Sequence, residues 1–165
     1  MTVKNGIEEV IKYLPREIKR IIENISNEII GEIEEIRLRG GAPLMVELRG
    51  EGCFITKDGG FCNNEDKAYI VSAEEIQKAF LSICENSIYA YTDERRQGFI
   101  TIKGGNRVGI CGKAVIENNG IKTFKEISSL NFRIAREVVG AADGIVDKVV
   151  FSKKIYNTLI VSPPG

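Results

Sequence analysis

The sequence predicts an α+β fold with a pair of N-terminal helices, an antiparallel or mixed sheet, and one or two helices packed on one face of that sheet. Three observations support this prediction. Apolar residues repeat every three or four positions over 7–25, alternate with polar residues in several later segments, and return to the helical period over 76–84. With 165 residues, the chain can bury a core without disulfides or metal.

Two short amphipathic repeats predict the N-terminal helices. Each repeat has isoleucine, valine or leucine at i, i+3, i+4 and i+7: Ile7, Val10, Ile11 and Leu14, then Ile18, Ile21, Ile22 and Ile25. Pro15 separates them and suits the first turn of the second helix, where its missing N–H needs no partner. A later helix is predicted from the capping box Ser72–Glu75, and another around residues 87–96.

Alternating segments predict the first strands of the sheet. Residues 35–39 and 44–48 alternate on either side of a Gly-Gly-Ala-Pro turn, which predicts two joined strands. Residues 49–67 are rich in Gly, Asn, Asp and Lys, which indicates an irregular or hairpin excursion.

The second half of the sheet is predicted to be a meander. Residues 98–110 form a hairpin around a Gly-Gly pair, residues 114–124 form another, and residues 131–136 add a strand. Gly109 and Gly112 have the G-x-x-G spacing of an RNA-binding clamp, but they fall inside a strand pattern, which favours a bulge or close packing.

Composition excludes several function classes. The formal net charge is zero, which argues against a dedicated binder of nucleic acid or anionic membrane. The absence of histidine excludes Ser-His and Cys-His catalysis. The four cysteines lack C-x-x-C spacing, which favours reduced thiols in a cytosolic protein over a zinc site. No stretch approaches the roughly 18 apolar residues of a membrane-spanning helix.

The C-terminal segment has the most informative motif. Residues 159–161 predict a buried strand, and Ser162, Pro163, Pro164 and Gly165 follow it directly. A strand entering such a turn is how a phosphate-binding P-loop begins, with Ser162 at its first position and the lysine beyond Gly165. A frayed tail is the alternative interpretation. Without that lysine, the chain alone is not expected to hydrolyse nucleotide.

Arginines on or beside predicted strands are the second candidate feature: Arg37, Arg39, Arg96, Arg107, Arg133 and Arg136. Strand alternation places two arginines that are two residues apart, Arg37 and Arg39, on one face. A guanidinium could bind a phosphate there, because it keeps its charge and offers a fork of donors. Ion pairing with the equally numerous carboxylates is the alternative.

Several segments together resemble the stage III sporulation protein AA family: 35–39, 43–44, 89–90, 96–102, 104–109, 127–137 and 156–165. The resemblance extends from about residue 34 to the end of the chain. It departs at Arg95, where family members commonly carry Leu, and at Asn106, where they commonly carry His. We interpret both as positions that tolerate a surface substitution, one at a helix end and one at a hairpin tip.

The family is similar to the ATPases of type II and type IV secretion and of pilus retraction. These have an N-terminal α/β domain, often PAS-like, linked to a RecA-like core, and they assemble into hexameric rings. The resemblance implies an N-terminal assembly domain over residues 1–137. Residues 138–165 would be a linker and the first helix and strand of a core truncated before its Gly-Lys-Thr. It implies ATP and Mg²⁺ in the full-length protein and neither in this fragment.

The resemblance also implies partners and site residues. Arg133 and Arg136, followed by Arg107, are the candidates to approach the γ-phosphate, and residues 162–165 would begin the nucleotide site. The expected partners are other copies of the chain and other stage III membrane-complex proteins, but not nucleic acid. The protein would energise the channel between mother cell and forespore from the mother-cell cytoplasm, reaching the membrane through partners. The alternative is a non-enzymatic module that docks a membrane-complex subunit.

Overall fold

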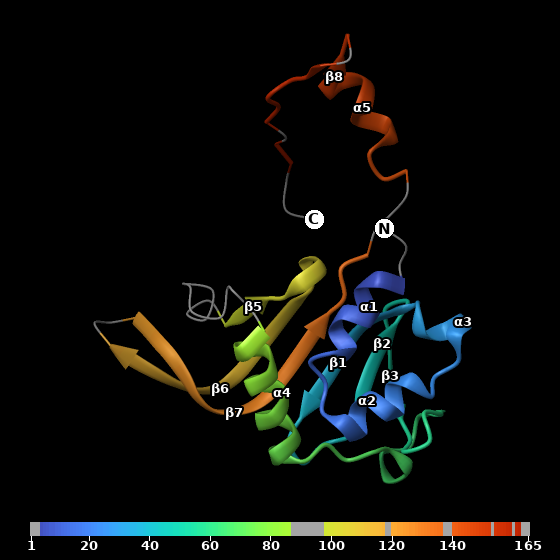
Figure 1. The fold of residues 1–165 in the computed structure, drawn as a ribbon, viewed down its shortest axis with the longest axis vertical. Helices are drawn as coiled ribbons and strands as arrows, with labels where there is room; N and C mark the ends of the chain where they lie inside the picture. The colour runs from blue at the N-terminus through green and yellow to red at the C-terminus, as the bar shows by residue number, and fades with distance from the viewer. Residues whose placement is uncertain are drawn as a thin grey trace.

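In the computed structural model, the described residues are 4–86, 98–117, 120–136, 140–152, 154–159 and 161–162. Helices lie on one side of a seven-stranded sheet, and a C-terminal segment stands apart from that sheet (Figure 1). The predicted fold class is therefore confirmed. The helix expected around residues 87–96 lies outside the described residues.

The helices are α1 (Lys4–Ile11), α2 (Arg16–Glu23), α3 (Asn27–Ile30), α4 (Ala73–Asn86) and α5 (Asp143–Val149), with 3₁₀ turns at Glu65–Lys67 and Lys103–Gly105. All but α3, which was not predicted, lie close to predicted positions. The N-terminal pair is confirmed as α1 and α2. Pro15 is the residue that precedes α2, one position earlier than expected, and its extended backbone starts the helix.

Every pairing in the sheet is antiparallel, and the strand order is β4-β3-β2-β1-β7-β6-β5. The strands are β1 (Ile33–Arg39), β2 (Met45–Leu48), β3 (Glu51–Ile55), β4 (Phe61–Cys62), β5 (Phe99–Thr101), β6 (Arg107–Glu117) and β7 (Gly120–Arg133). The excursion at 49–67 thus contains the β3–β4 hairpin, one of the two predicted alternatives.

Strands β6 and β7 form one long hairpin that replaces two shorter predicted elements. Of the strand expected separately at 131–136, residues 131–133 are the end of β7, which already begins at Gly120, and residues 134–136 lie beyond the strand. The ladder shifts register between Cys111 and Lys113, so a bulge interrupts it there. A Cβ on Gly112 would lie 2.7 Å from the Lys125 carbonyl oxygen, so glycine is needed for close packing, as the bulge interpretation of the G-x-x-G spacing predicted.

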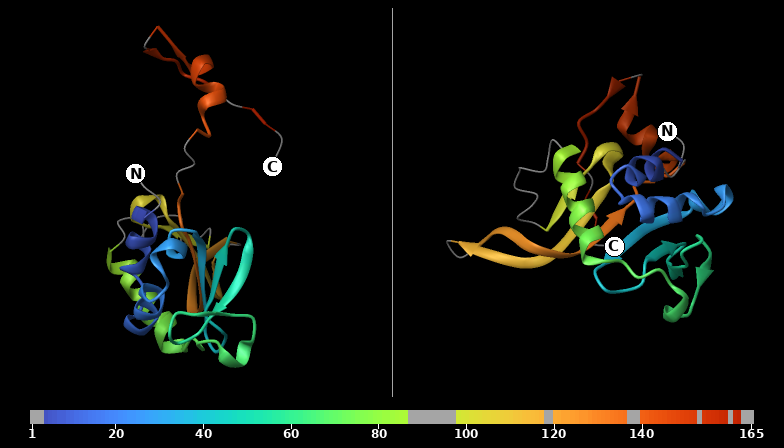
Figure 2. Two further views of the ribbon diagram at one scale, coloured as in Figure 1. Left: turned by 90° about the vertical axis from the view of Figure 1, so that its right-hand side faces the viewer. Right: turned by 60° about the horizontal axis from the view of Figure 1, so that its bottom comes forward.

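The core lies between the sheet and helices α1, α2 and α4 (Figure 2, left). We call this side of the sheet the covered face. The largest fully buried side chains are Phe132, Ile18, Ile21, Ile22, Ile33, Ile36, Leu38, Leu44, Ile55, Ile76, Ile83 and Ile100. Because strand residues alternate between faces, the polar neighbours of the buried strand residues lie on the opposite side, the open face, which no described helix covers.

The predicted capping box at the start of α4 is confirmed and has an additional partner. The Glu75 amide donates to Ser72 Oγ at 3.2 Å, and the Ser72 amide donates to Glu75 Oε2 at 2.9 Å. The Tyr69 hydroxyl donates to Glu75 Oε1 at 2.7 Å. Burial, and then this hydrogen bond to the carboxylate, raise the pKa of Tyr69 well above its usual value.

The C-terminal segment contains α5 and a two-stranded hairpin, β8 (Val150–Phe151) and β9 (Lys154–Ile155). The buried strand predicted at 159–161 is not observed among residues 156–159 and 161–162, and Leu159 and Val161 are 87% and 85% exposed. A strand needs hydrogen-bonded neighbours, and none of the described strands pairs with it. No helix within the described ranges is long and apolar enough to cross a membrane.

Candidate functional site

A row of charged residues crosses the open face at the level where β7 ends. Arg107 on β6 lies opposite Arg133 on β7, and Arg133 lies opposite Glu35 on β1. Glu35 in turn lies opposite Glu47 on β2. We call these four residues the charged row. It has two arginines at one end and two glutamates at the other, so like charges face each other twice.

Arg37 neutralises the acidic end of the charged row. Its Nε donates to Glu35 Oε2 at 3.1 Å, and its Nη2 forms an ion pair with Glu47. Asn131 also donates from Nδ2 to Glu35 Oε2, at 3.0 Å. Both carboxylates are mostly shielded from solvent, so their satisfied hydrogen bonds keep this end of the row closed.

The basic end of the charged row is more open. The Arg133 side chain is 73% exposed, and its described ion pair with Glu35 is long, at 3.9 Å. The Arg107 guanidinium lies 5.2 Å from the centre of the Phe99 ring, which is cation–π distance. Facing like charges destabilise a sheet, and no described carboxylate lies between these two arginines. The pair therefore leaves donors available for an anion.

Arg136 has a different environment from Arg133. Its Nη1 lies 2.5 Å from Glu34 Oε1, and the arginine side chain is only 30% exposed. Glu34 lies where the β1–β2 ladder shifts register, between Ile33 and Glu35. Of the three predicted arginines, the register thus brings Arg107 and Arg133 together, while Arg136 is held by a separate carboxylate.

The structure corrects the interpretation of Asn106. The sequence analysis placed it at a hairpin tip that tolerates a surface substitution, but its exposed fraction is 0%. Its Oδ1 accepts from the Ala135 amide at 2.8 Å, and its Nδ2 donates to the Lys103 carbonyl at 2.8 Å. A polar residue beside two glycines indicates a turn, and no periodic pattern in the sequence signals its burial.

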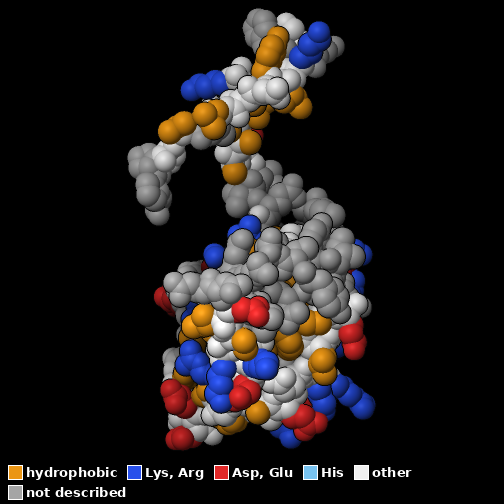
Figure 3. Space-filling view, turned by 90° about the vertical axis from the view of Figure 1, so that its left-hand side faces the viewer, with side chains coloured by type: hydrophobic (Ala, Val, Ile, Leu, Met, Phe, Trp, Pro, Cys, Tyr) orange, Lys and Arg blue, Asp and Glu red, His pale blue; other side chains and the backbone are white. Residues whose placement is uncertain are grey.

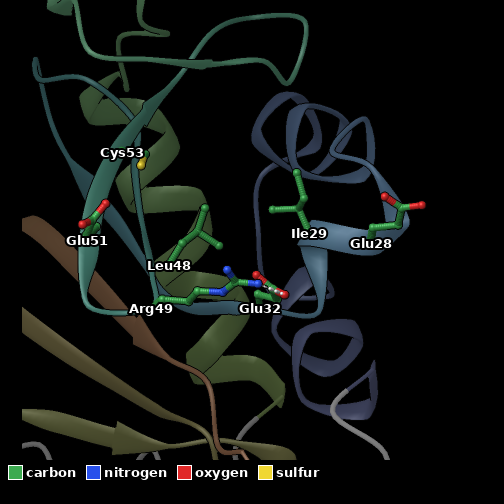
Figure 4. A pocket seen from close by; sticks show the side chains of 7 residues that line it. All are labelled: Glu28, Ile29, Glu32, Leu48, Arg49, Glu51 and Cys53. Atoms are coloured by element: carbon green, nitrogen blue, oxygen red, sulfur yellow. Dashed lines mark hydrogen bonds and ion pairs between the residues drawn. The ribbon is translucent and has the colours of Figure 1, made fainter.

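A separate hollow of about 660 Å³ lies between α3 and the β2–β3 turn (Figure 4). It is lined by Glu28, Ile29, Glu32, Leu48, Arg49, Glu51 and Cys53. Arg49 Nη2 donates to Glu32 Oε1 at 2.5 Å, and this ion pair raises the pKa of Arg49. The hollow lies on the β2–β3 part of the sheet, and none of the predicted arginines lines it.

Charges of both signs are mixed on the molecular surface. On the side seen in Figure 3, the coloured Lys and Arg side chains alternate with Asp and Glu, and apolar side chains lie between them. Within the described residues, no group of three or more carboxylate or thiol side chains could hold a metal ion. Of the predicted nucleotide-site residues, Ser162 is exposed, and Pro163, Pro164 and Gly165 lie outside the described residues.

Comparison with known proteins identifies related sequences. The sequence profile of the family described as "Sporulation stage III, protein AA" matches residues 4–165. The chain is 30% identical to stage III sporulation protein AA of Bacillus subtilis over 158 residues, which is 96% of this chain and 47% of that protein. It therefore spans about half the length of this curated relative.

Among solved structures, the chain is similar to the VirB11 ATPase of the Brucella suis type IV secretion system, crystallised with sulphate. The sequence identity is 14% and the TM-score is 0.38, and the match covers 80% of this chain and 35% of that one.

Proposed function

Because the chain belongs to the sporulation stage III protein AA family, we propose that it is the N-terminal domain of a secretion-type ATPase. The proposal places the catalytic core in the half of the Bacillus relative that this chain does not cover. Ser162, Pro163, Pro164 and Gly165 would begin the P-loop, and its lysine would follow. ATP with Mg²⁺ would supply the γ-phosphate whose transfer builds negative charge.

The structural observation that best supports this proposal is that Arg107 and Arg133 lie opposite each other on β6 and β7. Arg133 is exposed and weakly paired, so its guanidinium can turn toward an incoming phosphate without breaking a short ion pair. Arg107 adds a second positive charge beside it. Arg136 would first have to leave Glu34, so we rank Arg133 before it as the residue that neutralises the developing charge.

The proposed biological role follows the family. The full-length protein would assemble as a hexameric ring in the mother-cell cytoplasm and use ATP to energise the channel to the forespore. It would contact other stage III membrane-complex proteins and reach the membrane through them. The open face is one surface this assembly could use, since no described helix covers it, and the C-terminal segment, which stands apart from the sheet, is another.

The test extends the chain through the predicted Gly-Lys-Thr to the length of its Bacillus relative and measures ATP hydrolysis. Lysine-dependent turnover is expected, and replacing that lysine with alanine should abolish it.

Arg133→Ala should then lower kcat by about a thousandfold if Arg133 acts as an arginine finger. Arg39→Ala, an exposed arginine on neighbouring β1, is the matched control and should retain turnover. Equal turnover in the wild type, Arg133→Ala and Arg39→Ala would remove Arg133 from the mechanism.

A non-enzymatic docking module is the second candidate, and the long hairpin favours it. β5 pairs with β6 over residues 107–109, and the Ile110 amide donates to the Gly98 carbonyl, so the distal part of β6, beyond Ile110, pairs with β7 alone among the described strands. Ile116, on this distal part, is 71% exposed. A partner strand or apolar surface could dock there. Lack of lysine-dependent turnover in an assembled ring would favour this module over the ATPase.

A further inference from the structure

The ladder pairing of β7 ends at Arg133, but hydrogen bonds and an ion pair hold the chain for three more residues. Arg133 makes the final ladder pairs with Arg107 and Glu35. The Ile134 amide then donates to the Glu34 carbonyl at 2.9 Å. The next amide, that of Ala135, donates to a side chain, Asn106 Oδ1, at 2.8 Å. The Asn106 carboxamide thus accepts the hydrogen bond of the second backbone amide beyond the end of β7.

Asn106 reaches two further backbone segments from the same buried position. Its Nδ2 donates to the Lys103 carbonyl at 2.8 Å and lies 3.5 Å from the carbonyl of Gly6 in α1. A backbone amide can only donate and a carbonyl can only accept. The Oδ1 of the carboxamide must therefore face the Ala135 amide, and its Nδ2 must face the two carbonyls. One side chain therefore joins the β5–β6 turn, helix α1 and the end of β7.

The surrounding glycines show how closely these segments approach each other. A Cβ on Gly6 would lie 2.9 Å from both the Ala135 carbonyl oxygen and Ile134 Cγ2. A Cβ on Gly104, whose φ is +83°, would lie 3.1 Å from Asn106 Nδ2. Side chains at these positions would push the three segments apart, so the junction depends on both glycines and on the Asn106 carboxamide.

The geometry points to Asn106 as a positioning residue that fixes the chain where it leaves β7 and so sets where Arg136 lies. Arg136 directly follows the residue that Asn106 holds, and it lies in the segment leading toward α5. The expected effect of Asn106 on ATP turnover rests on the proposed ATPase function, because it requires Arg136 to face the nucleotide. The expected effect of Asn106 on the backbone at Ala135 does not depend on that function.

Amide hydrogen exchange in this chain tests the backbone part. Asn106→Leu keeps a side chain of similar size but removes both hydrogen-bonding groups, so the Ala135 amide should exchange about tenfold faster or more. The amides of Leu130 and Phe132 should keep their protection. Asn64→Ala is the matched control, because Asn64 Oδ1 accepts from the Asp66 amide at 2.9 Å far from β7. It should accelerate Asp66 and leave Ala135 unchanged.

A second variant covers the case in which Asn106→Leu does not fold. Ala135→Pro removes the donor N–H while Asn106 and the core stay intact, and the Ala135 side chain is exposed. The Ile134 amide, which donates to the Glu34 carbonyl, should then exchange faster, whereas the amides of β6 should not. Wild-type exchange at Ala135 in Asn106→Leu, or at Ile134 in Ala135→Pro, would overturn the inference.

Turnover of the extended protein tests the consequence for Arg136. If Asn106 acts through Arg136, Asn106→Leu and Arg136→Ala should each lower kcat, and the double variant should lose no more than Arg136→Ala alone. Independent, additive losses would contradict the positioning role. If Arg133→Ala and Arg136→Ala both retain full turnover, the proposed arginine function fails, and the exchange result alone decides whether Asn106 fixes the backbone.

Discussion

The two faces of the sheet differ in what their residues contact. On the covered face, Ile36, Leu38 and Phe132 are fully buried against helices. On the open face, their immediate neighbours Arg37 and Arg133 remain partly or largely exposed and contact carboxylates. Adjacent residues of a single strand thus have opposite roles. Stability should depend mainly on the first set and ligand binding on the second.

The largest effect on the free energy of unfolding is expected from truncating a buried side chain on the covered face. Phe132→Ala should lower the free energy of unfolding by about 3–5 kcal/mol, because it removes a fully buried ring and leaves a cavity. Ser129→Ala, on the open face of the same strand, should change it by less than about 0.5 kcal/mol. Urea denaturation of both variants measures the difference. Similar losses for the two would break the distinction between the faces.

A polar interaction on the covered side should have an intermediate effect. Tyr69→Phe removes a hydroxyl that donates to the buried Glu75 carboxylate, and we expect a loss of about 1.5–3 kcal/mol. The raised pKa of folded Tyr69 also has a pH consequence. Above about pH 10, the unfolded chain ionises this tyrosine while the folded chain keeps the proton, so stability falls as pH rises toward the folded pKa.

Denaturation at neutral and alkaline pH separates these two effects. The wild-type protein should lose stability above about pH 10 more steeply than Tyr69→Phe, so the two curves converge. Tyr13→Phe is a matched control at another buried tyrosine for which no partner of the hydroxyl is described. Parallel curves for the wild type and Tyr69→Phe would show that the Tyr69 hydroxyl is not coupled to folding.

The elements of the fold could be predicted because they depend on local patterns. The capping box at Ser72, the helical repeats and the alternating strands each carry their own periodic signal. The length of β7 could not be predicted, because the mostly polar residues between Phe124 and Leu130 interrupt its alternation. Strand order and register depend on pairings between residues far apart in the chain, which a single sequence does not encode locally.

The site was predictable only as a set of residues. Alternation placed Arg37 and Arg39 on one face, but it could not show that Arg107 lies opposite Arg133 or that Glu34 holds Arg136. The burial of Asn106 was missed because its three backbone partners come from distant segments, and no pattern around residue 106 indicates them. Tertiary hydrogen bonds of this kind have no sequence period.

The smallest effect on stability, and the sharpest test of the open face, is expected at Arg133. Arg133→Gln keeps a long polar side chain but removes one of two facing positive charges and a weak 3.9 Å ion pair. The repulsion from Arg107 and the attraction to Glu35 nearly cancel, so unfolding free energy should change by less than about 0.5 kcal/mol. At low salt the change should be toward greater stability, and high salt should remove it, because the charges are exposed and screened. A clear loss of stability at low salt would mean that Arg133 is held by the fold, and it would no longer be the weakly paired cation that the nucleotide proposal requires.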